Sequence, residues 1–513
     1  MEPINPNDLG LMNPNWSIMA ILPETIVAIA AMLVLVWESL FPRQGKVTGA
    51  ISLIGLVVAA FFIINNWNAA PGYSWNGMIA TDGLRTTFSI VFLFVSAMTI
   101  LISTVWTERE NVPVGDYHAM LMFATFGMMF MASGNDFVVI FLGLETLSIA
   151  SYVLAGLRKG DLKSNESAMK YFILGSFASA FLLYGMALVY GATGTTVVSE
   201  VALKIPEATF PVLLLVGGAM MLVGFGFKIA SVPFHVWAPD VYEGAPAPVT
   251  GFMAAGPKAA AFASFVRVFV LGFPLLKGVE AAGYLNTSWV TAVAVMAMLT
   301  MTIGNLAAAV QNNVKRMLAY SSISHAGYAM VGLLGAGVAL SSTARDEAIA
   351  GVAFYMLTYG ITTMGAFAVI TLLAGKNDVS TSFDDYNGIG FKSPALAFTL
   401  SLFMLSLLGL PLTAGFMGKI MVFRSALVSE NPLLTAVVVV AVVNTAISAY
   451  YYLRMMVVMF FRERTGEWTA PRIPAPIVAV LLITVIGVLY LGVFSDSTIK
   501  KFIRPNTVNA QIK

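Results

Sequence analysis

The sequence predicts an all-α polytopic membrane protein with about fourteen transmembrane helices, arranged as two inverted five-helix repeats that contain broken helices. Three observations predict this fold class. The 513 residues are 58% hydrophobic and only 11% charged, whereas a soluble domain carries about 25% charged residues. The apolar residues form runs of about 20, the length that spans a bilayer. Two of these runs, five spans apart, each carry one lysine beside a proline or glycine interruption.

The apolar runs give the predicted spans in chain order. Several are longer than a bilayer requires, so tilted or interrupted helices are expected. The predicted spans are 17–40, 47–67, 86–106, 117–133, 136–157, 166–192, 210–238, 248–275, 287–311, 314–338, 347–374, 394–426, 433–461 and 474–494. The segment before them, MEPINPNDLG, has no basic stretch, so we expect no cleaved signal peptide.

Basic residues are divided unequally between the two sets of loops. Those at the ends of odd-numbered spans are Arg43, Lys46, Arg109, Arg158, Lys159, Lys163, Lys315, Arg316, Lys376, Lys392, Arg462, Arg464 and Arg472. Loops after even-numbered spans hold only Arg85, Lys204, Lys277 and Arg345. Because basic loops stay in the cytoplasm, the first set is predicted to be cytoplasmic and both termini to lie outside.

The seventh and twelfth spans suggest the internal repeat. Lys228 lies five residues before Pro233, and Lys419 lies eight residues after Pro411. A repeat of five spans inserts upside down, and interrupted helices at matching positions mark the transport site of many carriers. The predicted regions are a three-helix region at 1–116, a first antiporter-like five-helix repeat at 117–275, a second inverted repeat at 287–461, and a C-terminal helix and tail at 462–513.

Composition excludes several kinds of chemistry. The chain has no cysteine and only three histidines, which excludes disulfides, thiolate zinc sites and iron–sulfur ligation. GFMGK and GFGFK resemble nucleotide loops, but no βαβ unit is expected around them. No basic nucleic-acid patch is present. Energy for any transport must therefore come from an ion gradient or from a partner.

Five ionisable residues within the spans are the candidate functional residues: Glu145, Lys228, Lys258, Lys419 and His325. A charge at a helix centre costs roughly 2.5–3.5 kcal/mol, so each is a functional hypothesis by default. The natural partner of Lys228 is Glu145, and the carbonyl that Pro257 frees is predicted to accept a hydrogen bond from Lys258. The alternatives are packing for Glu145 and a satisfied core histidine for His325.

Other polar residues have more ordinary interpretations. Lys170 is a sixth candidate, or else the partner of Glu166 in a helix-stabilising i, i+4 pair. Arg267 is expected to be structural and to snorkel, Glu24 to be wet and structural, and Trp237 and Tyr242 to lie at the membrane interface. His235, Asp240 and Glu243 form either a proton entrance or, the interpretation favoured here, loop-ordering hydrogen bonds.

A carboxylate and an amine in a dry interior can form a proton switch. Two unit charges about 5 Å apart interact by about 3 kcal/mol at an effective dielectric of 20. Moving one charge against 100 mV requires about 2.3 kcal/mol. Because the two energies are similar, moving Glu145 relative to Lys228 would make the lysine hold or release a proton. Broken helices admit the water and free the carbonyls that let such a charge persist.

Five stretches resemble one known family along nearly the whole chain: FLGLETLSIASYVLAG, SNESAMKYFILGSFASAFLLYGMALVYG, GFGFKIASVPFHVWAPDVYEGAPAPV, VKRMLAYSSISHAGY and LSLLGLPLTAGFMGKIMVF. They resemble the antiporter-like membrane subunits of respiratory NADH:quinone oxidoreductase (complex I), within the proton-conducting membrane transporter superfamily. The lysine at 419, ALVYGATG and the lack of a long C-terminal extension favour the subunit N family.

The resemblance implies a function and a setting. Glu145 and Lys228 would form the pair of the first half-channel, Lys258 the central connection and Lys419 the exit. The subunit would translocate protons in a bacterial inner membrane, driven by quinone reduction in partner subunits. It would bind no NADH, FMN, Fe–S cluster or quinone itself. Its partners would be other membrane-arm subunits, including sister antiporter-like subunits and small membrane subunits, and the lipid bilayer.

Three rival hypotheses remain. The chain could belong to an Mrp-type cation/proton antiporter, although lysines in the path would repel a metal cation. A membrane hydrogenase would use a similar chain. A passive scaffold is the third alternative, but a scaffold does not need lysines at mid-membrane.

Overall fold

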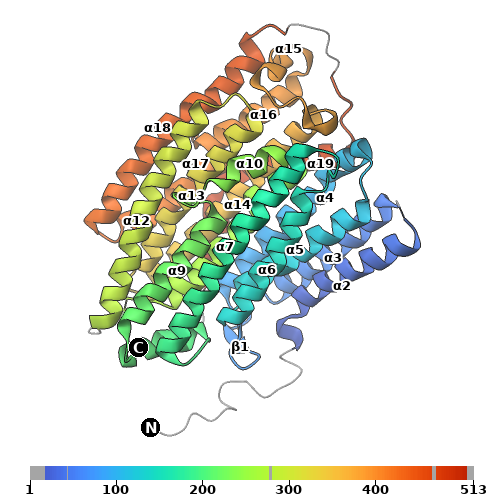
Figure 1. Cartoon of the computed structure of the whole chain (residues 1–513). Helices are drawn as coiled ribbons and strands as arrows, with labels where there is room; N and C mark the ends of the chain where they lie inside the picture. The colour runs from blue at the N-terminus through green and yellow to red at the C-terminus, as the bar shows by residue number, and fades with distance from the viewer. Residues whose placement is uncertain (1–17, 43, 276–279, 465–469, 505–513) are drawn as a thin grey trace.

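Figure 1 shows the chain as a bundle of long, roughly parallel helices. The structure, a computed structural model, describes residues 18–42, 44–275, 280–464 and 470–504. Within these residues, eleven helices are long and apolar enough to cross a membrane. Every predicted span coincides with one helix or with two halves of a broken one, so the predicted all-α polytopic membrane fold is confirmed. Arg43, Lys277 and both chain termini, which bear on the predicted sidedness, lie outside the described residues.

Several helices of the first half begin at an aspartate cap or at a proline. Asp136 caps one helix by accepting hydrogen bonds from the amides of Val138 and Val139, which would otherwise be unpaired at a helix start. The elements are α2 (Leu22–Leu40), α3 (Gly45–Asn65), α4 (Gly83–Glu110), α5 (Val114–Ser133), α6 (Phe137–Ala155), α7 (Leu162–Thr193), α8 (Val198–Lys204), α9 (Pro211–Ile229), α10 (Trp237–Gly244) and α11 (Ala247–Phe265), which continues as a π-helical segment over Val266–Leu271.

The second half has the same all-helical character. Four of its helices, α12, α14, α18 and α19, are among the candidate membrane spans. The elements are α12 (Glu280–Ala309), α13 (Val314–Gly337), α14 (Ser342–Leu373), α15 (Ile389–Lys392), α16 (Pro394–Leu408), α17 (Ala414–Leu427), α18 (Pro432–Phe461), α19 (Ala475–Val493) and α20 (Ser495–Phe502). Short 3₁₀ turns cover Ile205–Glu207, Lys376–Asp378 and Phe383–Tyr386.

A small β-hairpin, which the sequence analysis did not predict, marks one end of the bundle. Strands β1 (Gly72–Ser74) and β2 (Ile79–Thr81) pair antiparallel, and Ile79 forms a further bridge with Gly134. We call this the hairpin end, and the end that carries α15 the opposite end (Figure 1). The two names serve below because they do not depend on a membrane orientation.

Both predicted helix breaks are present. The span that holds Lys228 stops at Ile229, where Ala230 adopts a left-handed φ of 57°, and helix resumes at Trp237. The span that holds Lys419 stops at Leu408 and resumes at Ala414. Prolines lie inside both gaps, and a proline cannot donate the hydrogen bond that would continue a helix.

Two matched backbone links relate the halves of the chain. Before α6, the Phe137 amide donates to the Thr196 carbonyl at 2.9 Å, and the Val198 amide donates to Asn135 at 2.7 Å. Before α13, the Val314 amide donates to Thr381 at 2.7 Å, and the Phe383 amide donates to Asn312 at 2.9 Å. The first link lies beside the hairpin, next to Gly134, whereas the second precedes α15 at the opposite end (Figure 1). The same link at opposite ends is the pattern of an inverted repeat.

Helices α11 and α14 form the centre of the bundle. All of the most apolar window of α11 is buried, and 94% of that of α14. Helices such as α2, α3 and α18 bury only 33% of theirs, as expected where one side of a helix faces lipid or a partner. Lys258 lies on the fully buried α11, so this amine is at the core of the molecule.

Candidate functional site

Lys228 lies in the last turn of α9, beside the first break. It is 9% exposed, and its Nζ donates to the Ser148 hydroxyl on α6 at 2.6 Å. Three aromatic rings surround the amine: the distances from Nζ to the ring centroids are 5.7 Å for Tyr152, 5.8 Å for Tyr171 and 5.8 Å for Phe227. Aromatic faces stabilise a cation without neutralising it, so this pocket tolerates both charge states of the lysine.

Glu145 lies on α6, one turn before Ser148, and is partly exposed. Its carboxylate accepts a hydrogen bond from the Ser179 hydroxyl on α7 at 2.5 Å. Across the described part of the chain, no ion pair within 4.0 Å joins Glu145 to Lys228. Residues three apart share a helix face, so Glu145 and the serine that holds Lys228 point to the same side of α6. Glu145 and Lys228 therefore do not form an ion pair. Each is hydrogen-bonded to a different serine, Glu145 to Ser179 and Lys228 to Ser148.

Lys258 is 2% exposed and binds across to α13. Its Nζ donates to the carbonyl of Ser322 at 2.7 Å and to the hydroxyl of the same serine at 2.5 Å. The expectation that the carbonyl freed by Pro257 would accept from Lys258 is wrong. That carbonyl belongs to Met253, one turn before the proline, and it accepts from the Tyr242 hydroxyl at 3.2 Å. The Lys258 amine is therefore bonded to α13 and not to its own helix.

His325 lies within a cluster of tyrosine hydroxyls. Its Nδ1 shares a hydrogen bond with Tyr355 at 2.7 Å, and its Nε2 shares one with Tyr452 at 3.1 Å. Tyr452 in turn bonds to the Ser321 hydroxyl at 2.5 Å. Imidazole and hydroxyl groups both donate and accept, so this chain of contacts can carry a proton in either direction.

Lys419 lies on α17, after the second break, and is 4% exposed. Its Nζ donates to the Leu408 carbonyl at 2.8 Å and to the Thr445 hydroxyl at 3.4 Å. The amine also lies 4.5 Å from the centroid of the Tyr328 ring. A Cβ added at Gly409, whose φ is +89°, would lie 3.1 Å from the Lys419 side chain. Glycine is therefore needed there both for the turn and for the space.

Lys170, the sixth candidate, lies apart from the buried amines. Its side chain is 40% exposed and pairs with Glu166 and Asp240, each at 2.7 Å. Arg316 of α13 also binds Asp240, at 2.7 Å, and it binds Glu243 at 3.0 Å. Burial would raise the pKa of Asp240, but hydrogen bonds from Lys170 and Arg316 outweigh it and the pKa is lowered. These contacts fit the loop-ordering interpretation of Asp240 and Glu243.

Helix α13 supplies contacts that the sequence analysis missed. Ser322 binds Lys258, Ser321 reaches His325 through Tyr452, and the ring of Tyr328 covers Lys419. One helix therefore connects the environments of three candidate residues. The available signal was the hydroxyl-rich run YSSISHAGY inside an otherwise apolar span, because such groups must find partners in a dry interior.

Two expectations about charged residues within the spans are wrong. Arg267 does not snorkel: it is fully buried and binds both carboxylate oxygens of Asp82, at 2.5 and 3.0 Å, and the Ala132 carbonyl. Glu24 is not wet, since it is fully buried and forms a two-pronged pair with Arg85.

Two aromatic residues predicted at the membrane interface are buried inside the protein. Trp237 and Tyr242 are 3% and 1% exposed. The Trp237 ring stacks on Tyr171 with centroids 4.5 Å apart, and its Nε1 donates to the Phe227 carbonyl at 3.0 Å. The Trp237 ring therefore caps the first break, and Tyr242 packs against it with ring centroids 6.0 Å apart.

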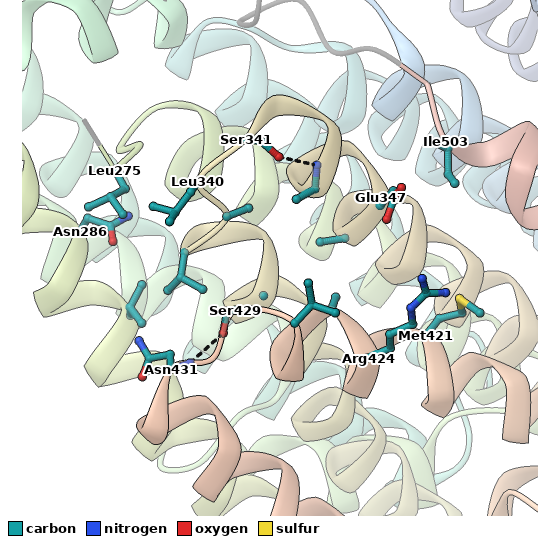
Figure 2. Close-up of a pocket in the computed structure, with 18 of the residues that line it drawn as sticks. Leu275, Asn286, Leu340, Ser341, Glu347, Met421, Arg424, Ser429, Asn431 and Ile503 are labelled. Carbon is teal, nitrogen blue, oxygen red and sulfur yellow. Dashed lines mark hydrogen bonds between the residues drawn. The ribbon is translucent and has the colours of Figure 1, made fainter. Parts of the chain in front are cut away.

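A cavity of about 800 Å³ opens beside the second half of the molecule. It lies where α14 begins and α17 ends, with Asn286 and Leu340 on one side and Met421 and Arg424 on the other (Figure 2). Arg424 follows Lys419 on α17 by five residues, or roughly 7.5 Å along the axis. Since α14 runs from this cavity to the opposite end, the cavity lies on the hairpin side of Lys419.

The fold and the site together define a class of protein. Two broken helices, each beside a buried lysine, together with a further buried lysine and a buried histidine, are typical of membrane proteins that move ions. Such intramembrane titratable groups are rare and mark ion or proton pathways.

Comparison with known proteins defines the family. A model described as NADH:quinone oxidoreductase/Mrp antiporter, TM matches residues 134–448. NADH-quinone oxidoreductase subunit N of Trichlorobacter lovleyi is 42% identical, over 92% of this chain and 93% of its own length. Subunit N 1 of Solibacter usitatus is 40% identical, over 92% of this chain and 94% of its own length. The chain therefore belongs to the subunit N family of NADH-quinone oxidoreductase, as the resemblance implied.

Solved structures support the same conclusion. A chain of respiratory complex I from Thermus thermophilus with bound aureothin is 33% identical, with a TM-score of 0.76, covering 93% of this chain and 98% of that one. A chain of the Mrp complex from Dietzia sp. has a TM-score of 0.79 at 18% identity, covering 97% and 98% of the two chains. The second likeness shows the shared fold alone.

Proposed function

We propose that the chain is the proton-translocating, non-redox membrane subunit of an NADH:quinone oxidoreductase, driven by quinone reduction in partner subunits. One observation carries the proposal. Lys228, Lys258 and Lys419 are all buried, and their hydrogen-bond partners in the described residues are hydroxyl and carbonyl groups without charge. A cation buried without a counter-charge is costly, so a modest change in nearby charge suffices to alter its protonation.

The proposed proton row runs along the middle of the molecule. We assign Glu145 and Lys228 to its first half, Lys258 to the centre, and His325 and Lys419 to the second half. The relay from Ser321 through Tyr452 to His325 supports this order. Lys170 is assigned to the loop network instead, because its side chain is 40% exposed and ion-paired.

We propose that the repeats occupy 117–275 and 287–461, flanked by a three-helix region at 1–116 and a C-terminal helix and tail at 462–513. The matched links at Asn135–Val198 and Asn312–Phe383 support the two repeats. The basic residues at the opposite end support a cytoplasmic side there, in a bacterial inner membrane. Both termini would then be periplasmic.

The partners of this chain would supply the redox chemistry. The sequence has no cysteine, and in the described ranges no group of three or more histidine and carboxylate residues could hold a metal. We propose that NADH, FMN, Fe–S clusters and quinone bind in other subunits. Other membrane-arm subunits, including sister antiporter-like subunits, would cover part of the exposed apolar surface.

The test is the substitution Lys258→Met in the assembled complex, reconstituted in vesicles. Methionine keeps an unbranched apolar side chain as far as Cε and removes the titratable nitrogen. We expect NADH:quinone electron transfer to be slowed and the protons moved per electron to fall. Full proton stoichiometry in this variant would favour the passive scaffold and reject the proposal.

Two rival transport functions are tested with the same vesicles. An Mrp-type antiporter would move Na⁺ or K⁺ against protons, so the proton gradient would depend on the metal cation present. We expect no such dependence, because three buried amines line the row. Co-purification of redox subunits that reduce quinone, rather than hydrogenase subunits, would separate the proposed complex from a membrane hydrogenase.

A further inference from the structure

A buried carboxylate outside the proposed proton row gathers several helices at the opposite end. Asp378 lies in the segment after α14, and its side chain is 3% exposed. Three cations lie within 4 Å of it: Arg109 at 3.4 Å, Arg158 at 3.6 Å and Lys315 at 3.3 Å. These come from the end of α4, the segment after α6 and the start of α13. None of the residues assigned to the proposed proton row explains why one carboxylate should bind Arg109, Arg158 and Lys315 together.

Asp378 also holds the start of the central helix. Its Oδ2 accepts a hydrogen bond from the Ala247 amide at 2.9 Å, and Ala247 is the first residue of α11. A carboxylate at a helix N-terminus satisfies an unpaired amide and is attracted by the helix dipole. Helix α11 carries Lys258, so Asp378 anchors the helix that holds the central amine.

Two of the cations around Asp378, Lys315 and Arg158, cap the end of α10, the helix that precedes α11. Lys315 donates to the carbonyls of Glu243 and Ala245, at 2.9 and 2.6 Å. Arg158 donates to the Gly244 carbonyl at 3.0 Å. These are the last carbonyls of α10 and its connection, which have no partner within the helix. The elbow between α10 and α11, residues 244–247, is therefore held from both sides by one ion cluster.

The backbone at Asp378 is itself strained. Asn377 and Asp378 have left-handed φ values of 58° and 51°, which residues with a Cβ seldom adopt. Such conformations persist only where surrounding contacts hold them, and they often serve a function. From this backbone the Asp378 side chain reaches the amide of Ala247.

We propose that Asp378 is a positioning residue that fixes Lys258 against Ser322, and this proposal rests on the proposed function. Lys315 and Ser322 lie seven residues apart on α13, which is about two turns, and Ala247 and Lys258 lie eleven apart on α11, about three turns. Both helices start at Asp378 and run away from it. Anchoring both on one carboxylate fixes their relative register, and with it the contact between Lys258 and Ser322.

The test compares Asp378→Asn with Glu110→Gln in the assembled complex. Glu110 is an equally buried carboxylate of the same cluster, 3% exposed, which pairs with Arg109 and accepts from the Asn377 amide. The contacts described for Glu110 do not reach the elbow. We expect Asp378→Asn to halve or more than halve the protons moved per electron, and Glu110→Gln to leave that ratio close to wild type.

Hydrogen exchange gives a second readout that does not depend on translocation. We expect the amides within residues 244–252, which exclude Pro246 and Pro248 because proline has no amide hydrogen, to exchange about tenfold faster in Asp378→Asn, because a neutral acceptor is weaker than a charged one. We expect no change there in Glu110→Gln. Equal effects of the two variants on both readouts would show a general need for charge balance and overturn the positioning role.

Two further variants separate this proposal from the proposed function. Asp378→Glu keeps the charge, and we expect it to restore most of the proton stoichiometry. If Lys258→Met lowers the stoichiometry while Asp378→Asn leaves both stoichiometry and exchange unchanged, the positioning role fails alone. If Lys258→Met translocates normally, the proposed function itself fails.

Discussion

The two broken spans use the same interruption but place the lysine on opposite sides of it. Lys228 belongs to the half-helix before its break, whereas Lys419 belongs to the half-helix after its break. At the first break, the Phe227 carbonyl is capped by the Trp237 indole, and the lysine turns away to Ser148. At the second, the lysine itself caps the Leu408 carbonyl that ends the preceding half-helix.

The difference separates two roles that a buried lysine can have. The break beside Lys228 is closed by aromatic and backbone groups, so this amine is free to change its charge and has a carboxylate on the neighbouring helix. Lys419 satisfies a carbonyl at the negative end of a helix dipole, where a cation is favoured. We infer that the first amine is mainly a switch, and that the second combines proton transfer with structural support.

The largest expected effect is the loss of translocation in Lys228→Met and Lys419→Met. Each variant removes a titratable nitrogen from the proposed row, and a barrier increase above about 1.4 kcal/mol slows the step about tenfold or more. We expect both to lower the proton flux of reconstituted complex at least to that degree. The measurement is quenching of a pH-sensitive dye in vesicles during NADH oxidation.

The control for both lysines is Lys170→Met, which removes an equally long side chain outside the row. We expect a much smaller loss of flux, since Lys170 is exposed and paired with Glu166 and Asp240. A Lys170→Met variant that stops translocation as completely as Lys228→Met would return Lys170 to the proton path.

The next effect concerns stability and distinguishes the two breaks. Lys419→Met leaves the partly buried Leu408 carbonyl without its donor, which costs at most about 1–3 kcal/mol. Lys228→Met leaves Ser148, whose hydroxyl still donates to the Leu144 carbonyl, so we expect a smaller loss. Thermal unfolding of the purified complex, followed by the release of subunits, measures the difference. Equal losses in the two variants would contradict the structural role assigned to Lys419.

A smaller effect is expected from Glu145→Gln. Glutamine still accepts a hydrogen bond from Ser179, so assembly should be retained while the negative charge is lost. We expect translocation to slow about two- to tenfold, which corresponds to about 0.4–1.4 kcal/mol, and electron transfer to remain coupled. The matched control is Ser179→Ala, which keeps the charge and removes the hydrogen bond. If only the serine variant slows translocation, the position of the carboxylate matters more than its charge.

Both breaks could be predicted from the sequence because their cause is local. Pro233 and Pro411 lack the amide that continues a helix, and a lysine near each proline in an apolar run is costly enough to indicate a functional site. The hairpin at residues 72–81 could not be predicted, because strands of three residues carry too little alternation to be recognised.

Side-chain partners could not be predicted for a different reason. Arg267 and Asp82 lie 185 residues apart in the chain, and only the tertiary fold shows that they meet in a dry interior. The snorkelling expected of Arg267 assumed that water was its best partner. Trp237 was likewise expected at the membrane surface because of its residue type, whereas stacking on Tyr171 places it inside the break.

The smallest expected effect concerns α10, the helix that follows the first break. This helix carries the carboxylates Asp240 and Glu243, whereas α17, which follows the second break, carries the basic residues Lys419 and Arg424. Because Lys170 and Arg316 lower the pKa of Asp240, its carboxylate contributes stability that is complete above its unfolded pKa of about 3.9 and is lost as pH falls through the lower folded pKa. The contribution should stay under about 1 kcal/mol, because the pair is partly exposed and screened by salt. We therefore expect Asp240→Asn to unfold at a lower temperature than the wild type near pH 6, and the gap to narrow as the pH falls below about 3.9. Glu166→Gln, which removes the other carboxylate bound to Lys170, should show a smaller gap, since its side chain is 60% exposed. If the gap between Asp240→Asn and the wild type persisted unchanged into acid, the carboxylate of Asp240 would stabilise α10 through its shape rather than its charge.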